Sequence, residues 1–64
     1  MPTSVVKREA SWQIKFEGRS EVVRVEIGNE GQIFIEQGTD IIALWPGDID
    51  VLVETLATAK AQAT

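Results

Sequence analysis

The chain has 64 residues, of which 44% are hydrophobic and 25% are charged, and its net charge at pH 7 is −4. This length allows a single domain, and this composition excludes a disordered chain and a membrane-embedded one. The sequence contains no cysteine, histidine or tyrosine, so it lacks disulfides, thiolate metal ligands and the usual proton shuttle of enzymes. Because a domain this small buries only about 60% of the surface that its unfolded chain exposes, we expect it to gain burial by association, most simply as a homodimer.

Alternating apolar and polar residues predict a series of strands in the first part of the chain. Residues 1–10 contain only the short apolar pair of Ser4-Val5-Val6, so we interpret them as a partly ordered arm or a short edge strand. Strands are predicted at 11–17, 21–28 and 32–37, separated by turns rich in glycine. Each strand places its apolar side chains on one common face: Trp12, Ile14, Phe16, Val23, Val25, Ile27, Ile33 and Ile35.

The stretch IALWPGDIDVL, residues 42–52, marks a change from strand to helix. Residues 41–45 are apolar throughout, which predicts a fourth strand that is covered on both faces or lies at an interface. After Pro46 the apolar residues follow the spacing of an amphipathic helix, which we expect to fray near residue 62; they are Ile49, Leu52, Val53 and Leu56. The predicted fold is therefore α+β, a four-stranded antiparallel meander followed by one C-terminal helix packed on one face, within a single domain at 11–62.

One helix covers only part of a four-stranded sheet, and the opposite face also carries apolar side chains. These are Val22, Phe34, Ile41, Ala43 and Trp45. Together they are more exposed apolar surface than a monomer usually shows, which again favours a homodimer or another protein partner.

The polar residues favour structural roles over chemistry. The glutamates lie singly at alternating positions, as on a solvated strand face, and do not form an acid–base pair. Asp48 and Asp50 fall at the predicted helix start, where negative charge is stabilising, and they lack the further oxygen ligands of a calcium loop. The glycines do not form a phosphate-binding loop. We therefore expect no catalytic residue, no metal site and no cofactor.

The charges divide the chain into two halves of opposite sign. Residues 1–24 carry a net charge of +2 and residues 25–64 a net charge of −6. Lys15 and Arg24 share a predicted face with Phe34 and Trp45, and Arg19 could extend the positive edge. Basic side chains interleaved with aromatic rings are what a single-stranded nucleic acid needs for its phosphates and bases.

The stretch QIFIEQGTDIIALWPGDIDVLVETL, residues 32–56, runs from a strand through an Ile-x-Leu strand and a proline into an amphipathic helix. In this layout the chain resembles the single-strand-binding transcriptional coactivator family and its distant relatives, the Whirly proteins. The resemblance implies a dimer-forming helix and single-strand binding by basic residues of the sheet. Only Lys15 and Arg24 match those basic residues here, with Glu26 and Glu36 on the same face.

The function that the sequence favours is a small, acidic, non-catalytic protein-interaction module, such as a regulator or inhibitor of a nucleic-acid enzyme of the kind that phages encode. Its expected partners are a second copy and a protein with a basic surface, and its expected compartment is the cytoplasm, since no membrane span or secretory signal is visible. The candidate partner-binding residues are Trp45, Phe34, Ile41, Asp48, Asp50 and Glu54. The alternative is a dimer that binds single-stranded DNA or RNA through Lys15, Arg19, Arg24, Phe34 and Trp45.

Overall fold

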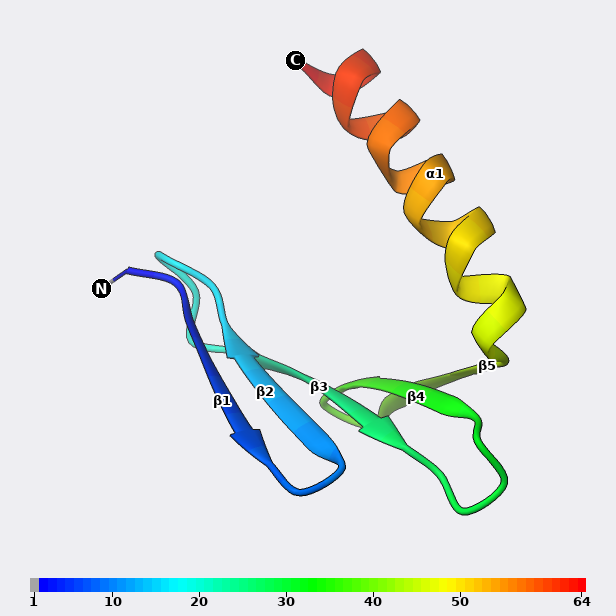
Figure 1. The fold of residues 1–64 in the computed structure, drawn as a ribbon. Coiled ribbons are helices and arrows are strands. Elements are labelled where there is room, and N and C mark those ends of the chain that lie inside the picture. The colour runs from blue at the N-terminus through cyan, green and yellow to red at the C-terminus, as the bar shows by residue number, and fades with distance from the viewer. Residues whose placement is uncertain (1) are drawn as a thin grey trace.

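A computed structural model describes residues 2–64 as an open antiparallel sheet followed by one helix (Figure 1). The five strands lie in chain order, and each pairs with the next, so the predicted α+β class and the meander are confirmed. The elements are β1 (Ser4–Arg8), β2 (Ser11–Lys15), β3 (Val22–Ile27), β4 (Ile33–Gln37), β5 (Asp40–Leu44) and α1 (Pro46–Ala63).

Strand β1 corrects the prediction of four strands. It pairs with β2 from Ser4 opposite Lys15 to Arg8 opposite Ser11, so the edge strand is the right interpretation of residues 1–10 and the arm is wrong. Met1 alone lies outside the described residues. The connecting turn consists of Glu9 and Ala10, and Glu9 has a φ of 45°. Neither residue is typical of turns, which is why the sequence gives no hairpin signal here.

The other turns lie where glycine predicts them. Gly18, Gly31 and Gly38 all have positive φ, a conformation that glycine adopts at little cost. The three strands predicted at 11–17, 21–28 and 32–37 are shorter than predicted by one or two residues, so Glu17 lies in a turn. Strand β5 has the predicted length but begins and ends one residue earlier, so Trp45 lies between β5 and α1.

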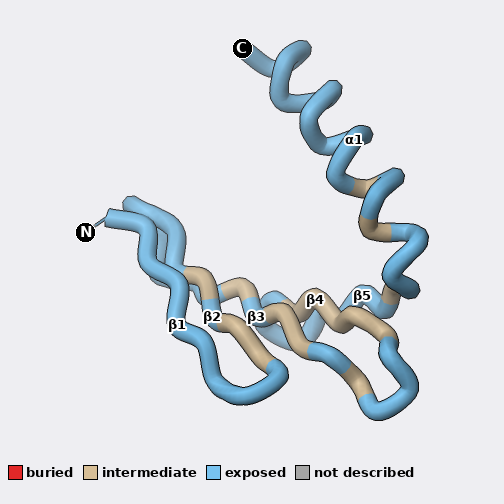
Figure 2. The backbone as a smooth tube through the Cα atoms, in the orientation of Figure 1, coloured by how far each residue is buried: buried red, intermediate tan, exposed pale blue. Residues whose placement is uncertain are grey.

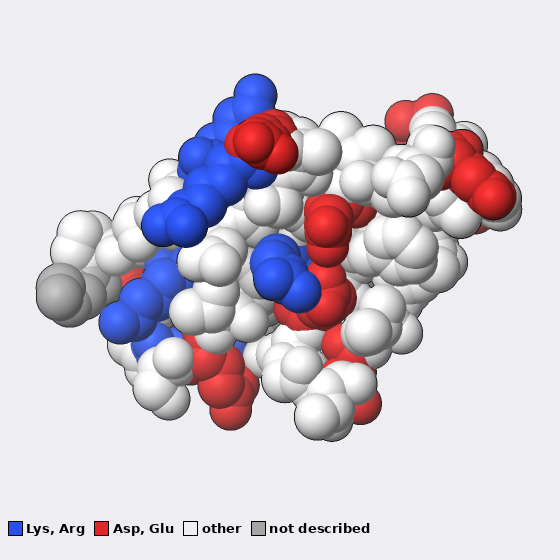
Figure 3. Space-filling model, turned by 90° about the horizontal axis from the view of Figure 1, so that it is seen from below, with Lys and Arg blue, Asp and Glu red and all other residues white. Residues whose placement is uncertain are grey.

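The pairing register assigns each strand residue to one of two faces of the sheet. One row of paired residues across β2 to β5 consists of Trp12, Val25, Ile35 and Ile42. Every second residue from these along each strand lies on the same face of the sheet. We call this the inner face, and on the three central strands it has no charged residue. Its apolar members are Val5, Trp12, Ile14, Val23, Val25, Ile27, Ile33, Ile35, Ile42 and Leu44, with Phe16 just beyond β2. The opposite, outer face carries charged side chains, and these are visible from the side away from the helix (Figure 3).

Helix α1 rises from the β5 edge on the side of the inner face but does not lie along the sheet (Figure 1). Ile49 and Leu52 are half-buried, whereas Val53 and Leu56 are 59% and 57% exposed. The prediction that the helix packs on one face of its own sheet is therefore wrong beyond its first two turns. The physical reason is the connection, since Trp45 alone separates β5 from α1 and leaves no chain with which to turn back across the sheet.

Candidate interaction surfaces

The inner face is an apolar surface without a cover. No residue in the described part of the chain is buried, and every side chain is either half-buried or exposed (Figure 2). Trp12, Val25 and Ile35 are half-buried, and Ile42 at the β5 edge is 56% exposed. The only cation on this face within the strands is Lys7, whose Nζ lies 5.4 Å from the centre of the Trp12 ring, a cation–π contact. The single chain therefore has apolar faces but no core.

A second apolar surface lies on the outer face beside the β5 edge. Phe34 is directly opposite Ala43, and Ile41 and Trp45 lie two residues to either side of Ala43 along the chain. Trp45 has extended backbone angles (φ −90°, ψ 158°), so the alternation of β5 continues through it. We call Phe34, Ile41, Ala43 and Trp45 the outer patch. The structure thus brings together three of the residues that the sequence offered as partner contacts.

The Phe34 ring lies against the backbone of Gly28. A Cβ atom built on Gly28 would be 2.6 Å from Cε2 of Phe34 and 2.8 Å from Oε1 of Gln32. Since real Cβ atoms do not approach so closely, any other residue here would displace the ring. The sequence explained Gly28 only as a turn residue, because the contact with Phe34 depends on the register between β3 and β4.

Carboxylates border the outer patch. Glu26 is opposite Phe34, and Glu36 is opposite Ile41. At the end of the patch, Asp48 accepts a hydrogen bond from the Trp45 backbone N–H at 2.9 Å, and its own N–H donates to the Trp45 carbonyl at 2.9 Å. This reciprocal arrangement fixes the start of α1, so the structural role predicted for Asp48 is confirmed.

The remaining acidic candidates lie on the helix, away from the patch. Asp50 is the fifth residue of α1 and lies beyond its first turn, so the prediction that Asp50 stabilises the helix start is wrong. At 100° per residue, Asp50 and Glu54 fall on the side of the helix away from the stripe formed by Ile49, Leu52 and Leu56. They are not part of the outer patch, and they extend the acidic surface along the helix.

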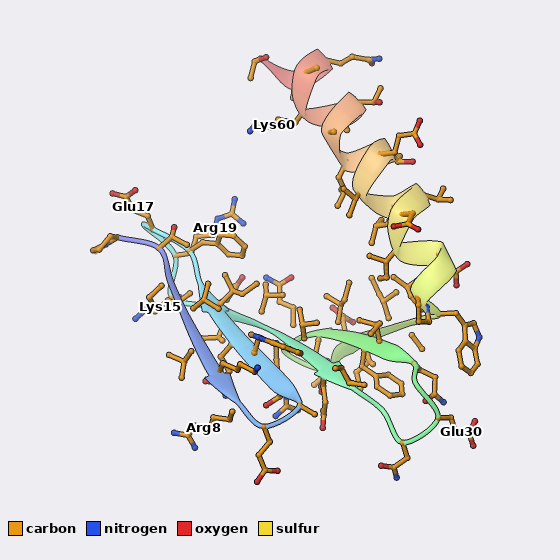
Figure 4. All side chains as sticks on the ribbon, viewed as in Figure 1. Arg8, Lys15, Glu17, Arg19, Glu30 and Lys60 are labelled. Atoms are coloured by element: carbon orange, nitrogen blue, oxygen red, sulfur yellow. The ribbon has the colours of Figure 1, made fainter. Side chains whose placement is uncertain are left out.

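The basic candidates do not form a continuous surface with the aromatic rings. Arg24 is opposite Glu36, to which it donates two hydrogen bonds, 3.1 Å from Nε and 2.9 Å from Nη2. This bidentate pair lowers the pKa of the Glu36 carboxyl and raises that of Arg24. Lys15 lies at the end of β2, and Arg19 lies in the next turn (Figure 4). Figure 3 shows the result: the basic groups gather over one half of the outer face, with some acidic groups among them, and the other half carries acidic groups and no basic ones.

Residues 2–64 contain no group of three or more acidic, histidine or cysteine side chains that could hold a metal ion. In the same range, no helix is long and apolar enough to cross a membrane. The surfaces with functional potential are therefore the inner face and the outer patch.

The fold and these surfaces define a small α+β protein with an open antiparallel sheet. Comparisons with models of protein families, with curated proteins and with solved structures found no match to this chain. The resemblance to the single-strand-binding coactivators stays a prediction, and the function has to be argued from the surfaces themselves.

Proposed function

We propose that this chain is a non-catalytic protein-interaction module that acts as a homodimer and binds a partner protein through the outer patch. The observation that carries the proposal is the strand register, which gathers Phe34, Ile41, Ala43 and Trp45 beside one edge of the sheet. Trp45 is 53% exposed and Ile41 is 60% exposed. Exposed aromatic and branched side chains that lie together are typical of interface centres.

The charge around the outer patch indicates the chemistry of the partner. Glu26 and Asp48 border the patch, Asp50 and Glu54 extend the negative charge along α1, and residues 25–64 carry a net charge of −6. Such a surface attracts a protein that presents an apolar side chain among lysines and arginines. Enzymes that act on nucleic acids carry basic surfaces for phosphate groups, so an acidic regulator or inhibitor of such an enzyme is the class that fits best.

Single-stranded nucleic acid is the weaker ligand for the outer face. In the strand register Arg24 is the basic residue nearest to Phe34, and Glu36 holds the Nε–Nη2 edge of its guanidinium. A phosphate group on the remaining Nη1 side would meet the negative charge of Glu36 across the pair and of Glu26 on the same strand. The net charge of −4 opposes such binding further.

The test is a pull-down from the native host with the tagged protein and two variants. We expect the protein and Val6→Ala to retain one partner protein through high-salt washes, and we expect Trp45→Ala to lose it. Val6 is the matched control, because it lies on the outer face and is 50% exposed but belongs to β1, far from the patch. Circular dichroism checks that both variants keep the fold.

Two results would count against the proposal. One is a pull-down in which Trp45→Ala retains the same proteins as the unmodified chain. The other is recovery of nucleic acid alone, together with binding of a labelled single-stranded oligonucleotide at ~50 mM salt that is lost in a Lys15→Glu, Arg24→Glu variant.

A further inference from the structure

We propose that a second copy of this chain closes the inner face, with helix α1 of each copy lying across the inner face of the other. This inference rests on the homodimer of the proposed function and deepens it, because it assigns the surfaces that form the dimer. It also supplies what the single chain lacks, which is a hydrophobic core.

The helix of one chain does not cover its own inner face. Two hydrogen bonds between Trp45 and Asp48 fix the direction in which α1 leaves β5, and no loop separates the two elements. The apolar stripe of the helix is uncovered from Val53 onward, and Leu56 is 57% exposed. One chain therefore has two apolar surfaces that do not meet each other.

The exposed area agrees with what a stable dimer would bury. The chain exposes 5378 Å², whereas a compact monomer of 7.0 kDa is expected to expose about 4,000 Å². The excess of about 1,300 Å² per copy amounts to about 2,600 Å² for two copies, which is within the range of obligate homodimers. The radius of gyration of 13.0 Å likewise exceeds the about 11 Å expected for a compact chain of this length.

Helix α1 is longer than the sheet is wide. Helix α1 has 18 residues and is about 27 Å long. Five strands span about 19 Å between the two edge strands. The helix of a second copy can therefore cross the whole inner face. In a twofold dimer each copy provides one helix and one face, so a single interface covers both helices and both sheets.

The charge distribution permits two acidic chains to meet in this way. Within the strands, the charged residues of the inner face are Lys7 on β1 and Asp40 on β5, at opposite edges of the sheet. On the helix, Asp50 and Glu54 lie away from the apolar stripe, and the charged residue on the side of the stripe is Lys60, in the last turn. The repulsion expected between chains of charge −4 is therefore kept out of the interface.

Cross-linking of introduced cysteines tests this arrangement directly, because the natural sequence has no cysteine. Val25→Cys places a thiol at the centre of the inner face, and Leu56→Cys places one on the helix stripe. The two single variants, one of them carrying a tag, are mixed, unfolded, refolded together and treated with a short bismaleimide. We expect a covalent heterodimer whose mass is twice the 7.0 kDa chain mass plus the mass of the tag.

The matched control replaces Val25→Cys with Ile41→Cys, which lies on the outer face and should give no heterodimer with Leu56→Cys. A chain that carries both Val25→Cys and Leu56→Cys should likewise form dimers. If that chain instead cross-links within itself at high dilution, its helix packs on its own sheet and the proposal is wrong. A 7.0 kDa species at micromolar concentration in sedimentation would also overturn it.

Two helix variants test the exchange of helices separately from the existence of a homodimer. Val53 and Val51 are similarly exposed, at 59% and 65%, but lie on opposite sides of α1. We expect Val53→Lys to abolish the dimer at micromolar concentration and Val51→Lys to retain it. A dimer that survives both substitutions and gives no heterodimer in the cross-linking experiment would refute the exchanged helices, while the homodimer and the outer patch would stand.

Discussion

Replacing Ile42 by alanine should weaken the dimer, whereas replacing its neighbour Ile41 should not. Both residues belong to β5 and they are similarly exposed in the single chain, at 56% and 60%, but Ile42 is on the inner face and Ile41 is on the outer face. Fully burying an isoleucine contributes about 1.5–3 kcal/mol, so covering the exposed half of Ile42 contributes about 1 kcal/mol in each copy. Ile42→Ala removes this contribution from both copies, a loss of about 2 kcal/mol per dimer, and therefore raises the dissociation constant of the dimer about 30-fold.

Sedimentation equilibrium over a range of concentrations measures this difference. Ile41→Ala is a close control, because it removes the same atoms from the same edge strand and so changes the strand propensity equally. We expect its dissociation constant to remain near that of the unmodified protein. Equal dissociation constants for the two variants, or a larger effect at Ile41, would show that the inner face is not the interface.

Two further predictions concern the sheet itself. Glu9→Gly should raise the free energy of unfolding by about 0.5 kcal/mol. Glycine adopts the left-handed conformation of Glu9 without strain, and this gain exceeds the cost of the entropy that glycine adds to the unfolded chain. Denaturant unfolding measures the change, and a loss of stability would contradict the assignment of strain to Glu9. The pKa of Glu36 is lowered by the hydrogen bond from Arg24, so the contribution of this pair to stability is complete above the ordinary pKa of 4.5 and is lost as the pH falls through the lowered value. Glu36→Gln should therefore flatten the acid side of the stability profile, and Arg24→Gln should do the same; an unchanged profile in both variants would show that the pair adds nothing.

The sequence predicts the two faces of the sheet well because a strand has a period of two. Trp12, Ile14, Val23 and Val25 needed no structure to be assigned to one surface, and Gly18 marked its turn correctly. Contacts across the sheet depend instead on register. The ion pair of Arg24 with Glu36 and the position of Phe34 between Ile41 and Trp45 could be assigned only once the strands were aligned.

Two elements differ from the prediction, each for a definite reason. The sequence does not distinguish strand β1 from an arm, because the turn Glu9-Ala10 has neither glycine nor asparagine and depends on Glu9 adopting a positive φ. The prediction that the helix packs on its own sheet is wrong because periodicity identifies an apolar stripe but not the surface that covers it. Val53 and Leu56 would show the same spacing whether they contact their own chain or another one.

Trp45 belongs to two parts of the molecule at once. Its side chain extends the outer patch, while its backbone N–H and carbonyl make the hydrogen bonds that anchor Asp48 and the start of α1. The orientation of the helix therefore depends on the backbone of this residue. A partner that shifts the Trp45 backbone would also rotate the helix. Because the helix is about 27 Å long, a small rotation at Trp45 moves its far end by several ångströms.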